Sequence, residues 1–516
     1  MNNKYPVIDL FAGPGGLGEG FSAFKTKESK LPFKIALSIE KDAFAHSTLE
    51  LRSFFRQFTG NKVPKDYYKY LRGEISKEEL FQKYPIQAKM ASEEAWHAEL
   101  GKKSHGEVRN KIKKALNKTK KWVLIGGPPC QAYSIVGRVR MMGKRPDDFE
   151  KDHRHFLYKE YLRIIRDHEP PVFVMENVMG ILSSKMKGKY IFDKILNDLK
   201  CPPRALRNTR KHKGMNGNLK YNIYSLVKIK NGNNSYEKNE YVIKCENYGI
   251  PQRRHRVILL GIRLDLNVTP DLLSESSRKI NMWDVLKDMP KLRSGVTDVK
   301  DSLDNWEKAI LSIRDYIWFR EKRVGKKLIN CMSSYLTKNK HFLSLGGEYV
   351  PHDKTPSCFK EWFFDPKIGG VCNHVARKHI RKDLCRYFYA ACFAEKHSKS
   401  PIIKDFPRVI WPDHENVIEA SRGNMFADRF RVQVKSKPST TITCHISKDG
   451  HYFIHPDPLQ CRSLTVREAA RLQTFPDNYY FEGPRTSQYS QVGNAVPPLL
   501  AKQVGQLVYD VIRQLE

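Results

Sequence analysis

The sequence lacks three features that would place it in a membrane, outside the cell or around a metal. No apolar run approaches the ~20 residues that a membrane-spanning helix requires. The N-terminal residues, MNNKYPVIDLF, lack the charged, apolar and small-residue order of a signal peptide. The ten cysteines form no Cys-x-x-Cys pair, which argues against a zinc ribbon or a redox motif. We therefore expect a cytoplasmic protein, with no membrane partner, whose thiols stay reduced.

One group of possible metal ligands remains, in which Cys372 and His374 are close in sequence and Cys385 follows. Structural zinc sites usually space their ligands more tightly. We therefore expect no bound metal and interpret these cysteines as buried thiols.

Acidic residues are scarce relative to basic ones. The chain of 516 residues has 91 Lys and Arg against 56 Asp and Glu, so its formal net charge is +35. Such a surplus favours a polyanionic partner, and nucleic acid is the first candidate. A solvated basic surface is the alternative, which charge alone does not exclude.

The first half of the chain alternates strand and helix patterns. Apolar runs that predict buried strands lie at 7–11, 34–40, 122–127, 172–178 and 256–262, with helical patterns between them. This alternation predicts an α/β fold with a doubly wound, mostly parallel sheet. Residues 42–120 read as mostly helical. Two further apolar stretches, 221–229 and 240–249, flank a polar turn and predict a hairpin.

The regular strand and helix patterns become weak from about residue 290 and return near residue 452. Aromatic residues, lysines and paired glycines interrupt the middle segment, which predicts a second, smaller and irregular domain. A final amphipathic helix, which starts at a proline, is expected to return to the first domain. We thus expect domains at 1–290 and 291–451, and a returning segment at 452–516.

Three glycines follow the first predicted strand as G-x-G-x-x-G, at Gly13, Gly15 and Gly18. They let the backbone turn tightly and approach a ligand, and Glu40, at the end of the next strand, can accept hydrogen bonds from ribose hydroxyls. The pattern fits a dinucleotide, and it also fits S-adenosylmethionine, which has the ribose but no pyrophosphate. A purely structural turn is the third interpretation.

Two reactive side chains also follow predicted strands. Cys130 stands behind two glycines and two prolines in IGGPPCQAYS, and Glu176 ends the strand VFVMENV. Ligands bind at the carboxyl ends of strands in doubly wound sheets. The thiol, the carboxylate and the glycine turn are therefore expected to share one crevice.

Six motifs occur in a fixed order: FAGPGG, GGPPCQAYS, MENV, YGIPQRRHRV, RSLTVREAARLQTFPD and QVGNAVPP. Together they resemble the motif series of DNA (cytosine-5) methyltransferases of the bacterial restriction–modification type. The resemblance implies a Rossmann-like domain that binds S-adenosylmethionine and acts on double-stranded DNA, with location at the bacterial nucleoid. The irregular middle segment falls where that family has its target-recognition domain.

The resemblance implies that Cys130, Glu176, Arg254 and Arg256 are catalytic. A thiolate that adds to C6 of cytosine makes C5 nucleophilic, which explains the thiol. Nearby arginines would favour the ionised thiol and balance the carboxylate. Two alternate arginines that lead into a strand are expected to face the same side.

The remaining site residues also come from the resemblance. We expect cofactor contacts from Phe11, Gly13, Gly15, Gly16, Leu17, Glu40, Lys41, Glu99, Pro128, Asn494 and Ala495. On the DNA side we expect Gln131, Ser134, Asn177 and Gln252, with Thr440 or Thr441 at a phosphate. Residues 131–155 are expected to form a lid that closes over the base, which must leave the duplex stack to react.

Three alternatives stay open at this point. A tRNA cytosine methyltransferase would use the same chemistry, although the long middle segment and the missing CFT stretch argue against it. A catalytically silent DNA-binding regulator would not need Cys130, Glu176 and Arg256 together. A dehydrogenase would bind a dinucleotide at the glycine turn. A monomer would suffice for the methyltransferase, and a separate restriction endonuclease is a possible cognate partner.

Overall fold

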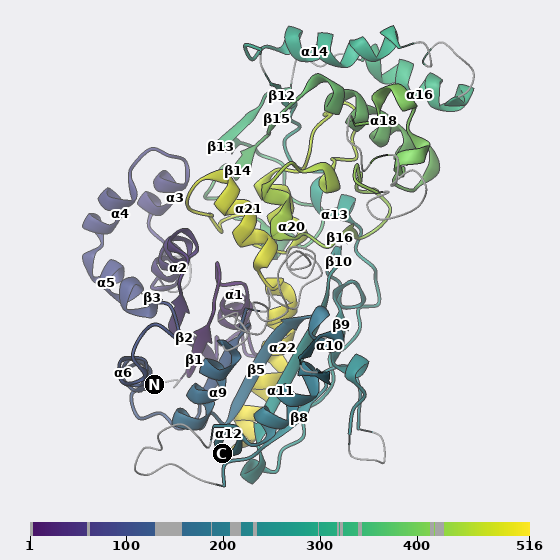
Figure 1. Cartoon of the computed structure of the whole chain (residues 1–516). Helices are drawn as coiled ribbons and strands as arrows, with labels where there is room; N and C mark the ends of the chain where they lie inside the picture. The colour runs from purple at the N-terminus through teal and green to yellow at the C-terminus, as the bar shows by residue number, and fades with distance from the viewer. Residues whose placement is uncertain are drawn as a thin grey trace.

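The computed structural model describes most of the chain, and Figure 1 shows its arrangement. The described residues are 4–58, 62–129, 157–186, 188–206, 218–230, 235–297, 299–316, 319, 324–338, 343–412, 417 and 428–515. A large α/β part occupies the lower half of Figure 1, and a smaller part that contains α14, α16 and α18 lies above it.

The large part is built on one mixed sheet in the order β3-β2-β1-β4-β5-β11-β8. Five strands from β3 to β5 run parallel, and β11 is antiparallel to β5. The strand bounds are β1 Tyr5–Leu10, β2 Phe33–Glu40, β3 Ala95–His97, β4 Val123–Gly126, β5 Val172–Val178, β8 Tyr221–Tyr224 and β11 His255–Arg263. This topology confirms the predicted α/β class with a mostly parallel sheet.

Helices cover both faces of the sheet, which explains why its strands read as continuous apolar runs. On one face α1 (Gly16–Ala23) and α22 (Pro498–Ile512) pack on side chains such as Val7 and Ile258. On the other face α6 (His105–Leu116), α9 (Leu157–His168) and α11 (Ile191–Lys200) form a second core. The C-terminal helix α22 thus packs against α1, the first helix of the chain.

The predicted helical segment 42–120 is present and forms a separate lobe beside β2. It contains α2 (Ala43–Arg56), α3 (Lys65–Leu71), α4 (Lys77–Lys83) and α5 (Pro85–Glu94), ahead of α6. Their apolar faces form a small core that also includes Ile368 and Cys372 from the smaller part of the protein. The short strand β3, which the sequence pattern did not predict, joins this lobe to the sheet through β2.

The predicted hairpin between 221 and 249 is wrong. The strands β8 and β9 (Val242–Lys244) each pair antiparallel with β11, at opposite ends of that strand. The apolar alternation was read correctly as strand. The pairing was predicted wrongly, because both segments pair with β11, a longer strand that comes later in the chain.

The middle segment has more helix than its sequence pattern indicates. Three helices, α14 (Leu303–Leu311), α16 (Lys326–Leu336) and α18 (Arg381–His397), share one apolar core. Buried residues occupy twelve of the seventeen positions of α18, on all its sides. A helix that is buried all round shows no 3.6-residue period, so the sequence pattern failed to reveal it.

Two short sheets complete the smaller part. The strands β13 (Gly346–Pro351) and β14 (Gly370–Val375) pair antiparallel, and β12 (Gly295–Val296) pairs with β15 (Lys378–His379). Helix α20 (Val466–Leu472) packs on β14 and on α21 (Arg485–Asn494). The segment after 452 therefore contacts the smaller part before it returns to the large one, and the exact boundaries of the domains stay a prediction.

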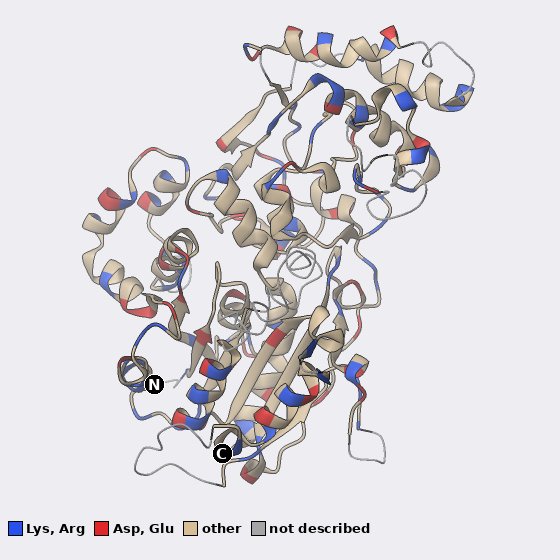
Figure 2. Cartoon of the chain, in the orientation of Figure 1, with Lys and Arg blue, Asp and Glu red and all other residues tan. Residues whose placement is uncertain are grey.

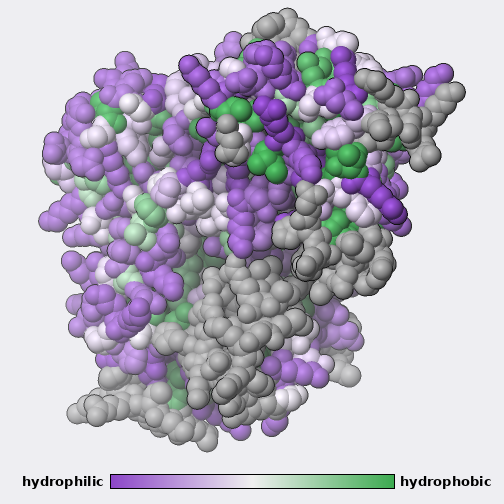
Figure 3. Space-filling view, turned by 45° about the horizontal axis from the view of Figure 1, so that its top comes forward, coloured by the Kyte–Doolittle hydropathy of each residue, from purple (hydrophilic) through white to green (hydrophobic). Residues whose placement is uncertain are grey.

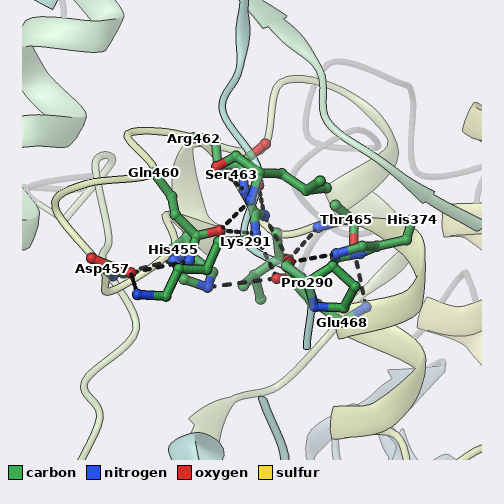
Figure 4. Close-up of polar contacts among 12 residues, drawn as sticks. Pro290, Lys291, His374, His455, Asp457, Gln460, Arg462, Ser463, Thr465 and Glu468 are labelled. Atoms are coloured by element: carbon green, nitrogen blue, oxygen red, sulfur yellow. Dashed lines mark hydrogen bonds and ion pairs between the residues drawn. The ribbon is translucent and has the colours of Figure 1, made fainter. Parts of the chain in front are cut away.

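A buried polar cluster fixes the chain where the two parts join, and Figure 4 shows its members. Arg462 donates to both carboxylate oxygens of Glu468 at 2.7 Å, and both side chains are at most 1% exposed. Burial alone would raise the pKa of Glu468, but Arg462 holds it below its ordinary value. The same cluster binds the linker at residue 290 through His374, whose ring nitrogens contact Thr465 and the carbonyl of Pro290.

Loss of charge at Glu468 should therefore destabilise the protein strongly. The Glu468→Gln variant leaves the Arg462 guanidinium unpaired in a dry site, which costs about 3–5 kcal/mol. Urea denaturation should detect this loss. The matched Asp304→Asn variant breaks an ion pair to Lys308 that is about two-thirds exposed, and it should cost under ~1 kcal/mol. Equal, small losses in both variants would show that the buried pair contributes little.

None of the helices in the described ranges is long and apolar enough to cross a membrane. The described surface in Figure 3 is mainly hydrophilic, with small and separate apolar patches.

Candidate active site

The glycine turn between β1 and α1 has the backbone geometry that its sequence predicts. Gly13 and Gly15 have φ values of 57° and 94°, in the left-handed region that favours glycine. A Cβ at Gly13 would meet no atom within 4 Å, so space is open beside the turn. A Cβ at Gly16 would lie 2.2 Å from the carbonyl oxygen of Val496, so the turn packs directly on the segment that follows α21. The structure thus brings Gly16 and Ala495 together, and their contact with the cofactor stays a prediction.

Glu40 connects the glycine turn to the end of β2. One of its carboxylate oxygens accepts a hydrogen bond from the Gly13 amide at 2.8 Å, and the other accepts one from the Asp42 amide at 2.8 Å. Each carboxylate oxygen has a second lone pair that remains able to accept a hydroxyl group. The carboxylate is therefore held in a fixed position at the mouth of the turn.

Two contacts that the sequence pattern did not reveal support the glycine turn. The Tyr479 hydroxyl donates to the carbonyl of Pro14. Glu19 in α1 accepts a hydrogen bond from Arg52 Nε at 2.9 Å, and both side chains are buried. A tyrosine more than 460 positions away in sequence cannot be assigned to this turn from spacing alone.

Asp9 in β1 is a buried carboxyl close to the turn. Its side chain is 1% exposed, and neither oxygen has a hydrogen-bond partner among the described residues. Burial raises the pKa of Asp9 to about 8. The carboxyl is therefore mostly protonated at neutral pH, which avoids an unpaired charge inside the sheet.

Lys41 and Glu99 lie at the same edge of the sheet. β2 and β3 pair in parallel with Glu40 beside His97, so the loops after both strands are neighbours. Glu99 forms ion pairs with Lys41 at 3.5 Å and with Lys102 at 2.7 Å. The pair borders the Glu40 end of the crevice, and an adenine contact from Glu99 stays a prediction.

These residues fit S-adenosylmethionine on two structural grounds. The space beside Gly13 admits a ligand against the backbone, and the fixed Glu40 carboxylate offers acceptors of the kind that ribose hydroxyls need. Phe11, with its left-handed φ of 55°, and the buried Leu17 flank the same turn. A dinucleotide would also require room for a pyrophosphate.

The second group of site residues, around Pro128 and Glu176, lies at the ends of β4 and β5. Pro128, buried directly after β4, accepts a hydrogen bond from the Asn177 amide group at 3.5 Å. A Cβ at Gly127 would lie 2.9 Å from a carboxylate oxygen of Glu176, so this turn and the carboxylate are close neighbours. Asn177 thus contacts the turn, and the turn lies directly against the Glu176 carboxylate.

Glu176 and Arg256 form an ion pair, with 2.9 Å between Arg256 Nε and the carboxylate. The sheet register explains the pair, because Arg256 lies opposite Val178, two positions from Glu176 on the same face. Both side chains are only 12% exposed, so solvent screens them weakly. The arrangement fixes a carboxylate and a guanidinium at the end of β5.

Arg254 has a different position from the one predicted. Its guanidinium donates to the carbonyl of Ile442 at 2.7 Å and to that of Gly493 at 3.2 Å, whereas Glu176 pairs with Arg256. Arg254 lies in the turn before β11, so strand alternation does not decide where it points. Burial and the neighbouring Arg256 lower the pKa of Arg254 to about 9, so it stays charged at neutral pH.

Gln252 supports the same junction. Its side chain is fully buried, accepts a hydrogen bond from the Ile442 amide at 2.7 Å, and donates to Gln473 at 2.9 Å. Its amide is therefore engaged with protein atoms, and a direct contact with DNA would require this network to open. Thr440 and Thr441 lie beside it: Thr440 pairs with Arg253, whose carbonyl accepts from the Thr441 hydroxyl at 2.6 Å.

Several predicted residues lie outside the described part of the chain. These are Cys130, Gln131, Ser134 and the predicted lid at 131–155. The described residue nearest to the thiol in sequence is Pro129, which follows the turn that Asn177 holds. A second thiol in this region, Cys245, is fully buried, and burial raises its pKa to about 12, so it is a poor nucleophile.

Comparisons with known proteins agree with this architecture. The chain is 34% identical to the type II methyltransferase M.Bpa9945I of Bacillus paralicheniformis, over 98% of this chain and 99% of that protein. It is 24% identical to the type II methyltransferase M.DdeI of Desulfomicrobium norvegicum, over 97% and 88% respectively. A solved prophage-encoded protein of E. coli shares the fold, with a TM-score of 0.52 and 16% identity over 99% of this chain and all of that one. A sequence model of C-5 cytosine-specific DNA methylases matches residues 87–201 and 213–509. The chain therefore belongs to the C-5 cytosine-specific DNA methylase family.

Proposed function

We propose that this protein transfers a methyl group from S-adenosylmethionine to C5 of a cytosine that has left the stack of duplex DNA. One observation carries the proposal. The Glu176–Arg256 pair lies against the turn that leads to Cys130, at the sheet edge that also presents the glycine turn and Glu40. The cofactor supplies an electrophilic methyl sulfonium.

The chain's own residues account for the remaining chemistry. The Cys130 thiolate adds to C6 of the ring, and the electron pair of the C5–C6 bond moves to C5, which then takes the methyl group. Loss of the C5 proton to a base returns the pair to the ring and expels the thiolate. This covalent route divides one difficult step into easier ones.

Glu176 acts on the far side of the ring in this proposal. When its carboxyl group is protonated, it can donate a hydrogen bond to N3, which stabilises the negative charge that develops on the ring as the thiolate adds to C6. Arg256 holds the carboxylate in place through the 2.9 Å ion pair and is positive toward the ring. Arg254 positions Ile442 and Gly493, which brings the smaller part of the protein against the catalytic edge.

The direct test uses duplex DNA, tRNA and a cofactor with a labelled methyl group. We expect label in DNA only, and bisulfite sequencing of DNA from expressing cells should locate the methylated cytosine. Label in tRNA alone would support the RNA alternative, and no transfer to either would support a silent DNA-binding protein.

Base recognition and assembly follow from the same proposal. We assign sequence recognition to residues 291–451, and we expect a monomer to suffice because both parts of the chain border one site. A cognate restriction endonuclease would act separately on the same DNA sequence.

Removal of the charge at Glu40 should weaken cofactor binding. In Glu40→Gln, one amide NH₂ group replaces a carboxylate oxygen that accepts from a backbone N–H, and the ribose loses a charged acceptor. Loss of a charge-assisted hydrogen bond costs about 1.5–3 kcal/mol, or roughly 10- to 100-fold in Kd for S-adenosylmethionine. Calorimetric titration measures this change. Glu28→Gln, an exposed control before β2, should bind as the parent does.

A further inference from the structure

A cavity of about 380 Å³ lies in the smaller part of the protein, away from the cofactor turn. It is bordered by the loop before β15, the segment 447–451 and the start of α21. The side chains that matter here are Arg377, Lys378, Lys448, Arg485 and Tyr489, and we call this cavity the Arg377 pocket.

Arg377 gives the pocket a rigid wall. It is 7% exposed, donates to the carbonyls of Ile446 and Lys448, and packs 4.0 Å from the ring centroid of Tyr489. Its Nε has no hydrogen-bond partner among the described residues. The Arg377 guanidinium therefore holds the loop that contains Lys448, and its positive charge lies at the wall of the pocket.

The other cations of the pocket have few acidic neighbours: Asp301 acts on Lys378, and its carboxylate is already paired with Arg293 at 2.8 Å. Lys378, Lys448 and Arg485 are exposed, and none forms an ion pair within the part of the chain that the structure describes. Arg485 donates one hydrogen bond, to the carbonyl of Ala376. Basic residues are spread over both parts of the molecule in Figure 2, and in this hollow several of them come together.

The acidic and histidine side chains at the pocket do not reverse its charge. Asp383 is paired with Arg386 at 2.6 Å, and Asp449 accepts a hydrogen bond from the His451 amide at 3.0 Å. Burial lowers the pKa of His379 to about 3 and also lowers that of His451. Both rings are therefore neutral at pH 7, and the four basic side chains exceed the two acidic ones.

One continuous segment connects the pocket to the active site. Ile442 is held by Gln252 and Arg254, and a Cβ at Gly493 would lie 2.3 Å from backbone atoms of Thr443 and Cys444. The next residues reach Arg377 at the pocket. From Gly493 back to Arg485, α21 spans about 12 Å at 1.5 Å per residue.

We propose that the Arg377 pocket binds a backbone phosphate of the substrate DNA that flanks the target cytosine. Phosphates follow one another by about 3.4 Å along the duplex axis of each strand, so a duplex that reaches the catalytic edge has several phosphates within about 12 Å of it. The proposal rests on the proposed function, because it takes duplex DNA as the substrate.

The test compares two charge-matched triple variants of the full chain. One is Lys378→Gln/Lys448→Gln/Arg485→Gln, and the control is Lys27→Gln/Lys30→Gln/Lys120→Gln, whose exposed residues precede β2 and β4 at the opposite edge of the sheet. The measurement is Kd for duplex DNA between 50 and 200 mM salt, with S-adenosylhomocysteine present, together with KM and kcat.

Each lost phosphate contact removes about 0.9 from the slope of log K against log salt. The ratio of Kd at 200 mM to Kd at 50 mM should therefore fall about 40-fold in the pocket variant if all three contacts are lost. KM for DNA should rise at least about tenfold, while KM for the cofactor and kcat at saturating DNA stay within about twofold.

Two results separate this proposal from the function on which it rests. If the parent protein methylates DNA and the pocket variant keeps the control's salt slope, the pocket does not contact phosphate. If the parent transfers no methyl group to DNA, the proposed function fails, whatever the salt slopes show. A variant that loses kcat and melting temperature together would indicate a structural role for these cations, and it would also overturn the proposal.

Discussion

Replacement of Cys130 by alanine should abolish methyl transfer to DNA, with a fall in kcat of about 10⁴- to 10⁶-fold. The thiolate is the only group in the proposed route that can make C5 nucleophilic, and removal of the nucleophile from a concerted catalytic set commonly costs this much. Transfer of labelled methyl to duplex DNA measures the loss. A second readout is the denaturant-resistant adduct on DNA that contains 5-fluorocytosine, where the fluorine blocks loss of the C5 proton.

The matched control for this variant is Cys201→Ala. Cys201 is a half-buried free thiol that follows α11, on the far side of the sheet from the glycine turn. Its loss should leave both the turnover and the adduct within about threefold of the parent. An adduct that persists in Cys130→Ala would assign the nucleophile to another thiol and overturn the mechanism.

Neutralisation of the carboxylate in Glu176→Gln should lower kcat by about 10²- to 10³-fold, the scale for a preorganised group that stabilises transition-state charge. The change keeps the size of the side chain but removes the proton donor and leaves Arg256 without its partner at 2.9 Å. Since both side chains are somewhat more exposed than those of the Arg462–Glu468 pair, the loss of folding stability should be smaller than for Glu468→Gln. Single-turnover kinetics with excess enzyme measures the chemical step directly.

A neighbouring glutamate provides the control. Glu246 pairs with His255 at 2.8 Å, and His255 precedes Arg256 in β11. Glu246→Gln removes a hydrogen-bonded carboxylate at almost the same place in the fold without touching the carboxylate at the end of β5. Equal losses of kcat in the two variants would mean that local packing, and not the Glu176 carboxylate, limits the reaction. Recovery of activity in Glu176→Asp, even in part, would support the charged group.

The candidate site shows where sequence reasoning succeeds. Gly13 and Gly15 need a left-handed φ, and Glu40 ends the next parallel strand, so short-range chemistry was enough to place the turn and its carboxylate together. Glu176 and the turn at Gly127 follow adjacent parallel strands, which end at one edge by topology. Each of these positions depends on a pattern of a few residues and on the alternation of strand and helix.

Sequence reasoning fails at three places: Arg254, α18 and the Arg377 pocket. Arg254 and Arg256 are two positions apart, so strand alternation would place them on the same face. The hydrogen-bond partners of Arg254 are instead carbonyl groups 188 and 239 positions away. Helix α18 is buried on all sides, so its period is hidden. The cations of the pocket come from three separate segments of the chain, and no spacing rule joins them.

The sequence by itself determined the alternation of the main strands and helices in the first half of the chain, the glycine turn and the side chains at the strand ends, because these follow from local conformational preference and from the direction of parallel strands. Tertiary structure alone decided which arginine pairs with Glu176, which edge β8 and β9 join, and which lysines meet around Arg377. These outcomes depend on packing between segments hundreds of residues apart, where burial makes an unpaired charge or backbone group costly and so selects one partner among many.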